Sequence, residues 1–513
     1  MSEEDGGKKG GGKKGGGRKG GGRKGGGKRG GGSPRPGRGR PQSRNDATER
    51  RRGSGATVAR LVAVRVLERV ERVHAYADIA LHQALARSPL SAADRALATE
   101  LAYGTLRWRG RIDYLLSQVL DQKLEKLEPL VASTLRLGAY QLLFMDRIPQ
   151  SAAVDQAVAC AHSLGSSRAT GLVNAVLRRL ARESETLPLP AFEDDPLEHI
   201  VHALSLPEWI ARRWIDEFGA EEAAALAVAS NTTPPVTIRA NRRCTTPAAL
   251  LEELREKFPD AHRCTLAPDG LVLGHGGNPA SSPAFLEGRY TVQDEASQLV
   301  VCLLDPQPDD RVLDTCAAPG TKATAIAERL GEEGRVLALD RNLKRLGLVD
   351  RDARRLGLRG ITTLSRDATL PLVDLAASDA DADAPQAKDF DRVLVDAPCS
   401  GLGTLRRNPD ARWRLSAEDP TRLATVQAAI LHEASRVLRP GGCLVYSTCT
   451  VLREENQEIV AAFLQDHPHF RQVPRGELPE SLTPVLEEDG TLRCLPHRVA
   501  TDGFFAVRLE RTQ

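Results

Sequence analysis

The stretch Leu394-Val-Asp-Ala-Pro-Cys-Ser-Gly401 ends an apolar run with a carboxylate, a proline and a thiol. The apolar run predicts a buried strand, and the Pro and Gly residues after it predict a loop. Asp396 and Cys399 are therefore expected at the C-terminal edge of a sheet, where open α/β sheets bind their ligands. A second thiol, Cys449, follows another apolar run, Cys443 to Tyr446. Two cysteines that each follow a strand need a joint explanation.

Length and composition restrict the class of protein. A chain of 513 residues has room for two or three domains, and a hydrophobic content of 41% is sufficient for packed cores. No run of about 18 apolar residues occurs, and the N-terminus has no apolar segment, so neither a membrane span nor a secretory signal is predicted. The nine cysteines form no CxxC pair and have no zinc-like spacing. They are predicted to be reduced thiols of a cytoplasmic protein without a metal site.

The basic charge is concentrated at the N-terminus. Residues 1–53 carry 17 of the 71 Lys and Arg residues and 5 of the 68 Asp and Glu residues, so their net charge is +12 and that of the remainder is −9. Residues 1–55 are rich in Gly, Lys and Arg, cannot form a core and are predicted to be disordered. Two interpretations stay open: a tethered polycation that gains RNA affinity by counterion release, or a merely solubilising tail.

Residues 56–183 have the apolar spacing of helices. Apolar residues recur at intervals of three and four, as in Val58, Leu61, Val62, Val66, Val70 and Val73. This spacing gives a helix one apolar face. Ser91-Ala-Ala-Asp94 has the pattern of an N-terminal cap, and Pro129 and Pro149 fall at predicted helix starts. The region is predicted to be an all-α bundle.

Residues 184–285 are predicted to form a linker followed by a small α+β region. The predicted elements are the helices Leu206–Phe218, Ala220–Ser230 and Pro247–Phe258 and the strands Val236–Asn241 and Gly270–Leu273. Arg239, Asn241 and Arg242 are candidates for RNA contact, although the sequence favours a solvated surface role for each of them.

Residues 286–513 alternate between strand and helix patterns, which predicts a Rossmann-like α/β domain with a mostly parallel sheet. The predicted strands are Arg311–Leu313, Val336–Leu339, Ile361–Leu364, Arg392–Val395, Cys443–Tyr446 and Phe504–Leu509. The predicted helices include Thr321–Leu330, Pro420–Leu438 and Glu454–Gln465. The Asp- and Ala-rich segment Asp379 to Ala387 is predicted to be a mobile loop.

A small-residue loop and three acids predict a ligand site in this domain. In Asp314-Thr-Cys-Ala-Ala-Pro-Gly-Thr-Lys322 a strand ends in an acid, and a loop of small residues leads into a helix. Small side chains allow close approach of the backbone to a ligand. Asp340 ends the next predicted strand, where an acid suits a ribose diol, and Asp367 follows the third. Neither GxGxxG nor a P-loop is present.

Several motifs resemble known families. Asp314–Lys322, Asp396–Gly401 and Ser447–Thr450 resemble the S-adenosyl-L-methionine-dependent RNA cytosine-C5 methyltransferases. In the helical region, Asp94-Arg95, Glu100–Gly104, Arg147–Pro149 and Val173–Arg178 resemble the NusB-type RNA-binding domain. Further matches are Val292–Gln298, Arg406–Asp410 with Trp413, and Glu454–Asn456. Together, the chain from residue 56 onward resembles the RsmB (Sun/Fmu) family, which methylates small-subunit (16S) ribosomal RNA.

This resemblance implies roles for individual residues. It implies cofactor binding by Cys316, Ala317, Ala318, Pro319, Gly320, Thr321, Lys322, Asp340, Asp367 and Asp396. It implies that Cys449 is the nucleophile, that Cys399 assists product release, and that Asp396 stabilises charge on the cytosine. It also implies a monomer with S-adenosyl-L-methionine as cofactor. One departure is Pro319-Gly-Thr-Lys-Ala323, where the family usually has Pro-Gly-Gly-Lys-Thr. The added Cβ of Thr321 is expected to weaken cofactor binding or shift the helix start.

Arginines and a tryptophan follow the Cys399 loop and are candidates for phosphate contact and base stacking, with a surface role equally open for each of them. They are Arg406, Arg407, Arg412, Trp413 and Arg414. Three alternatives to 16S RNA methylation stay open: a cytosine-C5 methyltransferase acting on transfer RNA, one acting on DNA with Cys399 as nucleophile, and a non-catalytic RNA-binding assembly factor. The Thr-Cys context of Cys449 and the RNA-type helical region argue against the DNA enzyme.

Overall fold

The computed structural model describes residues 55–274, 277–375 and 390–513. The prediction of disorder for the basic tail falls outside these residues except at Gly55, and the predicted mobile loop Asp379 to Ala387 also lies outside them. The described residues form part of one compact unit, which runs from Ser54 to Gln513.

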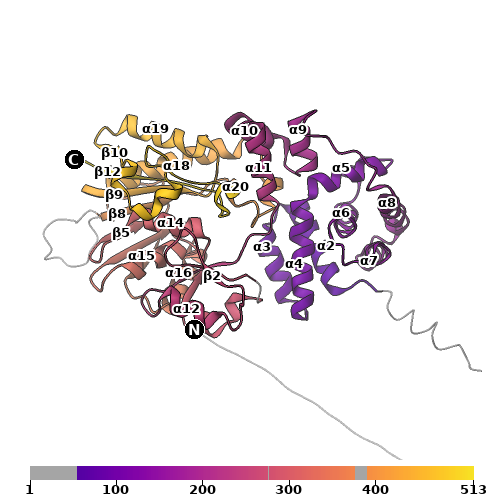
Figure 1. Ribbon diagram of the computed structural model, residues 1–513, viewed down its shortest axis with the longest axis horizontal. Helices are drawn as coiled ribbons and strands as arrows, with labels where there is room; N and C mark the ends of the chain where they lie inside the picture. The colour runs from indigo at the N-terminus through magenta and orange to yellow at the C-terminus, as the bar shows by residue number, and fades with distance from the viewer. Residues whose placement is uncertain (1–54, 275–276, 376–389) are drawn as a thin grey trace, which may run out of the picture. The chain divides into compact units, whose positions relative to one another are not determined.

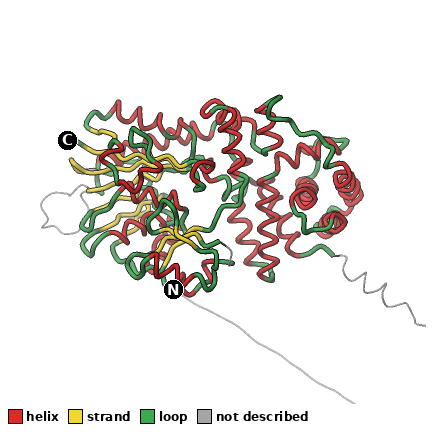
Figure 2. The backbone as a smooth tube through the Cα atoms, viewed as in Figure 1, coloured by secondary structure: helices red, strands yellow, loops and turns green. Residues whose placement is uncertain are grey.

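Seven α-helices form the first region, as predicted, and Figure 2 draws it as helices and loops alone. They are α2 (Val58–Val73), α3 (Ala77–Ala86), α4 (Ala92–Arg107), α5 (Arg109–Val119), α6 (Pro129–Phe144), α7 (Gln150–Ser163) and α8 (Thr170–Glu183). The Ser91 hydroxyl caps α4 by accepting a hydrogen bond from the Asp94 amide at 3.1 Å. Of the predicted apolar face of α2, Val62, Val66 and Val70 are buried and Leu61 is half-buried, whereas Val58 and Val73 at its ends are exposed.

The next region contains a small antiparallel sheet with the strand order β2-β3-β1-β4. Its strands are β1 (Thr237–Ala240), β2 (His262–Arg263), β3 (Gly270–Val272) and β4 (Tyr290–Val292). Its helices are α9 (Pro196–Glu198), α10 (Glu208–Phe218), α11 (Ala220–Ser230), α12 (Pro247–Leu254) and α13 (Pro283–Leu286). Leu250 and Phe258 pack under the sheet in a core of their own. The predicted α+β character of this region is confirmed.

The last region is built on a larger sheet with the strand order β10-β12-β9-β8-β5-β6-β7, and β11 pairs with β12. The strands are β5 (Arg311–Asp314), β6 (Arg335–Asp340), β7 (Ile361–Ser365), β8 (Phe390–Asp396), β9 (Leu438–Thr448), β10 (Phe470–Gln472), β11 (Leu492–Cys494) and β12 (Phe504–Arg511). The path from β9 to β7 is parallel, and β12 runs antiparallel to β9. The six predicted strands all occur. The pattern missed β10 and β11, which are only three residues long.

Helices cover both faces of this sheet (Figure 1). They are α14 (Glu295–Leu304), α15 (Thr321–Arg329) and α16 (Leu343–Arg355) on one face and α18 (Asp419–Arg436) and α19 (Gln457–Asp466) on the other. Two short helices, α17 (Ala411–Arg414) and α20 (Pro496–Val499), pack toward α10 and α11 instead. Successive residues of β8 point to opposite faces: Leu394 packs in the cluster with α14 to α16, whereas Val393 and Val395 pack in the cluster with α18 and α19. A strand buried on both faces explains why the sequence here is continuously apolar.

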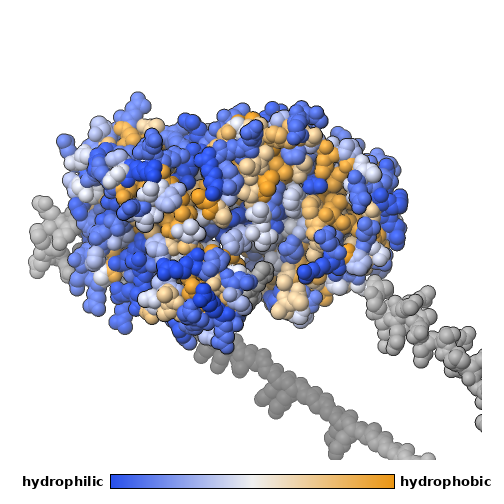
Figure 3. All heavy atoms as spheres, in the orientation of Figure 1, coloured by the Kyte–Doolittle hydropathy of each residue, from blue (hydrophilic) through white to orange (hydrophobic). Residues whose placement is uncertain are grey.

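Within the described residues, no helix is long and apolar enough to cross a bilayer. The face shown in Figure 3 carries hydrophilic side chains over much of its area, with apolar side chains in smaller groups. All nine cysteines are free thiols, as predicted.

Candidate active site

Four acidic residues stand at or just beyond the C-terminal ends of neighbouring parallel strands. Asp314, Asp340 and Asp396 end β5, β6 and β8, and Asp367 follows β7. In the sheet β5 lies beside β8, although β6 and β7 separate them in the sequence. The order of the strands therefore reverses between β5 and β8. Ligands of open α/β sheets bind in the crevice outside such a switch point.

A cavity of about 270 Å³ lies at these strand ends. Seven of the predicted site residues line it: Cys316, Ala318, Asp340, Asp367, Asp396, Cys399 and Cys449. Five others do not line it: Ala317, Pro319, Gly320, Thr321 and Lys322. Sequence reasoning missed the lining residues Thr315, Arg341, Arg345, Arg366, Ala368, Thr369, Ala397, Pro398, Val426 and Ile430. Most of these adjoin a predicted residue in the chain, but Val426 and Ile430 come from the distant helix α18.

The small-residue loop turns sharply at Gly320 to enter α15. Gly320 has a φ of 113°, and a Cβ at this position would stand 3.0 Å from the Cα of Val349. Glycine is favoured here because the conformation is left-handed and the space is filled. Thr321 is the first residue of α15, so the helix starts where the sequence predicts. Its Cβ does not crowd the cavity, because Thr321 is not one of the lining residues.

Lys322 and Asp396 form an ion pair beside the cavity. The Nζ atom of Lys322 donates to Oδ2 of Asp396 at 2.7 Å, and the hydroxyl of Ser447 donates to Oδ1 at 2.9 Å. Burial alone lowers the pKa of Lys322, but the charge and hydrogen bond of Asp396 and the charge of Cys449 outweigh burial and raise it. Lys322 is therefore a buried cation that faces both Asp396 and the Cys449 thiol.

The two thiols come together, with Sγ of Cys399 3.4 Å from Sγ of Cys449. Cys399 follows β8 and Cys449 follows β9, and these strands are parallel neighbours. Both side chains are half-buried and line the cavity. The hydrogen bond with Cys449, together with burial, raises the pKa of Cys399 well above its usual range. Cys399 therefore remains a protonated thiol that can donate a hydrogen bond to a thiolate at Cys449.

Two further acids form the opposite part of the cavity. Asp340 accepts a hydrogen bond from the amide of Asn342 at 2.8 Å, and Asp367 accepts one from the amide of Thr369 at 3.0 Å. Arg345 contacts both Asp340 and the small-residue loop. Its guanidinium group is 3.7 Å from the Asp340 carboxylate and donates to the carbonyl of Ala318 at 2.6 Å. The local hydrogen bonds fix the acids, so both carboxylates are preorganised for donors of a ligand.

Asp314 is fully buried beneath this cavity. Among the described residues, its Oδ2 atom has no hydrogen-bond partner. Burial, with the negative charge of Asp396, raises the pKa of Asp314 to about 7. The unfolded chain ionises this acid near pH 4. Folding therefore opposes ionisation of Asp314, and this penalty grows as the pH rises from about 4 to about 7.

Asp314→Asn is expected to make stability less dependent on pH. The asparagine carries no ionisation penalty, so its free energy of unfolding relative to wild type should rise between pH 4 and pH 7, by up to about 1.4 kcal/mol per pH unit. Above pH 7 the difference should be constant. Denaturant midpoints measured at pH 5 and pH 8 test this. Parallel pH profiles for the two proteins would contradict the penalty.

The arginines after the Cys399 loop are not free RNA contacts, which corrects the interpretation drawn from the sequence. Arg406 is buried and donates to Asp502 at 2.7 Å, and Arg407 pairs with Asp502 at 2.6 Å. Arg412 is fully buried and donates to the Arg107 carbonyl and to the side chain of Asn231. These guanidinium groups have internal acceptors, so they hold the loop to the rest of the chain.

The two remaining residues of this group also have internal partners. Nε1 of Trp413 donates to the Leu106 carbonyl at 2.6 Å. Arg414 pairs with Asp410 at 3.4 Å and lies over the ring of Tyr76. Five basic or aromatic residues in close succession thus serve contacts between distant parts of the chain, a use that their spacing does not reveal.

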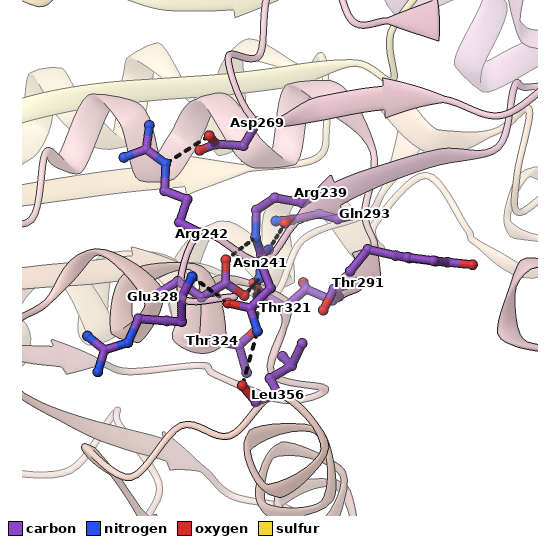
Figure 4. A network of polar contacts seen from close by, with 12 residues as sticks. Arg239, Asn241, Arg242, Asp269, Thr291, Gln293, Thr321, Thr324, Glu328 and Leu356 are labelled. Carbon is purple, nitrogen blue, oxygen red and sulfur yellow. Dashed lines mark hydrogen bonds and ion pairs between the residues drawn. The ribbon is translucent and has the colours of Figure 1, made fainter. Parts of the chain in front are cut away.

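For Arg239 and Asn241 of the small α+β region, both RNA contact and the solvated surface role favoured by the sequence are wrong, because both side chains are buried (Figure 4). Arg239 is buried and donates to Glu328 at 2.8 Å and to the Thr321 carbonyl at 2.9 Å. Asn241 is also buried and donates to two carbonyls. Arg242 alone keeps an exposed side chain, which pairs with Asp269 at 2.8 Å. Arg239 of β1 therefore connects the small sheet to α15, the helix that follows the small-residue loop, through these hydrogen bonds.

Known families match all three folded regions. A model of the family described as 16S rRNA methyltransferase RsmB/F matches residues 301–510. A model of the NusB family matches residues 57–182, and a model of the ferredoxin-like domain of RsmF/B-like methyltransferases matches residues 206–278.

Individual relatives match over most of the chain. The "Probable ribosomal RNA small subunit methyltransferase B" of Bacillus subtilis is 37% identical, over 89% of this chain and 99% of the relative. The "Ribosomal RNA small subunit methyltransferase B" of Pseudomonas putida is also 37% identical, over 81% of this chain and 90% of the relative. The crystal structure of PH0851 superimposes with a TM-score of 0.74 and 27% identity, covering 89% of this chain and 99% of that one. With this sheet, this cavity and relatives so similar along their length, the chain belongs to the RsmB/F family of 16S rRNA methyltransferases and is an S-adenosyl-L-methionine-dependent RNA methyltransferase.

Proposed function

We propose that this protein methylates C5 of a cytosine in small-subunit (16S) ribosomal RNA through a covalent bond between Cys449 and C6 of the base. The observation that carries the proposal is the pair of thiols, 3.4 Å apart, at the wall of a cavity lined by strand-end acids. Cytosine C5 is a poor nucleophile. Addition of a thiolate to C6 converts the ring to an enamine, which makes C5 reactive toward an activated methyl group.

Cys449 is the nucleophile in this proposal. A thiolate is the reactive form, and a neighbouring cation favours it. Lys322 is a cation whose pKa responds to the charge of Cys449, and Cys399 is a protonated thiol at hydrogen-bond distance. A cation and a thiol donor beside its sulfur support the assignment of the attack to Cys449 rather than to Cys399.

Asp396 is proposed to form a hydrogen bond with the cytosine while it is ion-paired with Lys322. Negative charge develops on the cytosine ring during attack at C6, and a hydrogen bond at N3 stabilises it. Asp396 lines the cavity beside both thiols, and its two oxygens are oriented by Lys322 and Ser447. The cytosine takes up a proton from solvent at N3 as the thiolate adds to C6, and the Asp396 carboxylate accepts the hydrogen bond from that N3–H group.

Cys399 assists release of the product. After methylation, C5 carries both the methyl group and a proton. A base such as water takes the C5 proton, and its bonding electrons restore the double bond between C5 and C6. The bond from C6 to Cys449 breaks, and the Cys399 thiol donates a hydrogen bond to the thiolate that leaves. Cys399 stands 3.4 Å from the sulfur that must leave, so it is positioned for this step. The target base must enter the cavity unstacked, which favours a flipped or single-stranded cytosine.

The residues of the cavity fit S-adenosyl-L-methionine. The proposed binding residues are the lining residues Cys316, Ala318, Asp340, Asp367 and Asp396, together with Ala317, Pro319, Gly320, Thr321 and Lys322 of the adjoining small-residue loop and helix start. When bound, the cofactor supplies an activated methyl group on a cationic sulfur. Asp340 and Asp367 offer carboxylates to a ribose diol and an adenine amino group. The carboxylates of Asp340, Asp367 and Asp396 line the cavity, which suits a ligand with a cationic sulfur.

The substrate is proposed from the relatives, which are named for the small-subunit ribosomal RNA. Cells that lack this protein are expected to lose one or more 5-methylcytosines from small-subunit ribosomal RNA, and bisulfite sequencing of ribosomal and transfer RNA would detect the loss. Return of the signal with the wild-type gene is the control. Loss confined to transfer RNA, or an unchanged map, would overturn the proposed substrate.

The remaining proposals concern organisation. The division is a basic tail over 1–55, a NusB-like RNA-binding domain over 56–183, a linker with a small RNA-contact region over 184–285 and a catalytic domain over 286–513. The family matches at 57–182, 206–278 and 301–510 support the last three parts. The enzyme is proposed to act as a monomer, in the cytoplasm with its RNA.

A further inference from the structure

The proposed chemistry depends on the positions of two thiols that belong to different loops. Cys399 follows β8, and Cys449 follows β9. A nucleophile displaced by about 1 Å loses on the order of 100-fold in rate. The separation of the two sulfur atoms therefore has to be fixed by groups outside the loops themselves. Two adjacent residues just before α19, Glu455 and Asn456, make the contacts that fix it.

Asn456 holds the loop of Cys449 on both sides of the thiol. Its Oδ1 atom accepts a hydrogen bond from the hydroxyl of Thr448 at 2.6 Å. Its Nδ2 atom donates to the carbonyl of Thr450 at 3.1 Å. Thr448 and Thr450 are the two neighbours of Cys449 in the chain, so one side chain brackets the nucleophile.

Glu455 holds the loop of Cys399. Its Oε1 atom accepts from the amide of Ser400 at 2.8 Å, and its Oε2 atom accepts from the Ser400 hydroxyl. Gln427 of α18 donates both to Glu455 and to the carbonyl of Pro398, each at 3.0 Å. Both neighbours of Cys399 in the chain are therefore held: Glu455 holds Ser400, and Gln427 holds Pro398.

The contacts that hold the Cys399 loop and those that hold the Cys449 loop are joined directly. The hydroxyls of Ser400 and Thr450 lie 2.8 Å apart, so the residue after one thiol contacts the residue after the other. Glu455 and Asn456 are 0% and 2% exposed, and neither lines the cavity. Substrate and cofactor in the cavity do not reach them, so any effect of these side chains on the reaction passes through the thiol loops.

We propose that Glu455 and Asn456 are positioning residues with separate tasks: Asn456 sets the nucleophile Cys449, and Glu455 sets the release thiol Cys399. This inference rests on the proposed function, because it assigns each contact to one step of that reaction. Disturbing Asn456 slows formation of the covalent bond. Disturbing Glu455 slows its resolution, so the bonded complex of enzyme and RNA persists.

The test uses the full chain and an unmodified 16S ribosomal RNA transcript. Asn456→Ala is expected to lower the single-turnover rate of methyl transfer about 100-fold without accumulation of covalent complex. Glu455→Ala is expected to accumulate the complex on denaturing gels. Glu455→Gln should restore resolution, because the Ser400 hydroxyl can reverse and accept from the amide while the Ser400 amide keeps an oxygen acceptor.

The matched control is Glu454→Ala, which removes the neighbouring acid. Glu454 pairs with Arg213 and contacts neither thiol loop, so both steps should match wild type. Thermal melting and binding of S-adenosylhomocysteine report whether each variant is folded. If Glu455→Ala fails to fold, Ser400→Ala replaces it in the test. Ser400→Ala removes only the hydroxyl that donates to Glu455, and a several-fold accumulation of the covalent complex of enzyme and RNA is expected.

Equal slowing of both steps by the two alanine variants, or wild-type behaviour of either, would overturn the inference. Cys449→Ala and Cys399→Ala are run in parallel. If Cys449→Ala still methylates RNA at the wild-type rate, the proposed chemistry itself is wrong. If the two cysteine variants behave as proposed and Glu455→Ala resolves normally, only the positioning role fails.

Discussion

Cys449→Ala is expected to lower methyl transfer to RNA by at least about 10⁴-fold, because the reaction loses its nucleophile. Cys399→Ala is expected to lower turnover as well, but for a different reason. Its nucleophile is intact, so the bond to C6 forms and is then resolved slowly. Alanine at either position removes only a sulfur atom from the cavity wall, so binding of the cofactor should change little.

A transcript that contains 5-fluorocytidine separates the two roles. Fluorine at C5 cannot leave as a proton does, so the bonded complex persists once it forms. Wild type and Cys399→Ala should form this complex, and Cys449→Ala should not. With unmodified RNA, only Cys399→Ala should accumulate it. The opposite pattern, with trapping lost in Cys399→Ala, would indicate the order of thiols used by DNA cytosine methyltransferases.

Arg239→Met is expected to destabilise α15 by about 3–5 kcal/mol, because it leaves the carboxylate of Glu328 buried without a counterion. The two side chains are 3% and 2% exposed and lie 2.8 Å apart (Figure 4). Arg239 also donates to the Thr321 carbonyl in the first turn of α15. The loss should therefore spread to the small-residue loop and weaken binding of S-adenosyl-L-methionine.

Native-state hydrogen exchange of the α15 amides measures this local stability. Arg242→Met is the matched control: its side chain is 47% exposed and pairs with Asp269, so the effect should stay within about 1 kcal/mol. The double variant Arg239→Met with Glu328→Gln removes both charges and should recover much of the loss. Equal destabilisation by the single and double variants would show that packing, rather than the unpaired charge, is responsible.

The core strands could be predicted because each of them has a recognisable pattern in the sequence. A continuous apolar run followed by an acid predicts a buried strand whose end meets a ligand, and Leu394 to Asp396 gives this pattern in three residues. The short strands β10 and β11 could not be predicted in this way. Each is only three residues long and is fixed by pairing with β12, and for β10 this partner lies beyond β11 in the chain.

The arginines show where sequence patterns mislead. Arg406, Arg407 and Arg412 have the spacing and charge of a phosphate-binding segment, but each is paired internally. A charged side chain is buried only when partners come from elsewhere in the chain. Those partners, such as Asp502 and Asn231, lie from about 95 to more than 180 residues away, so local sequence carries no sign of them.

The sequence by itself determined the parts of this enzyme: a helical region, a small α+β region, and a parallel sheet with acids and thiols at its strand ends. Side-chain periodicity and turn chemistry are local, so they survive in the sequence. Only the tertiary structure decided which groups meet. Strand order brings Cys399 to 3.4 Å from Cys449 across 50 residues of chain, and it buries Glu455 behind both loops. Those distances depend on the pairing of β8 with β9, which long-range packing fixes and no local pattern records.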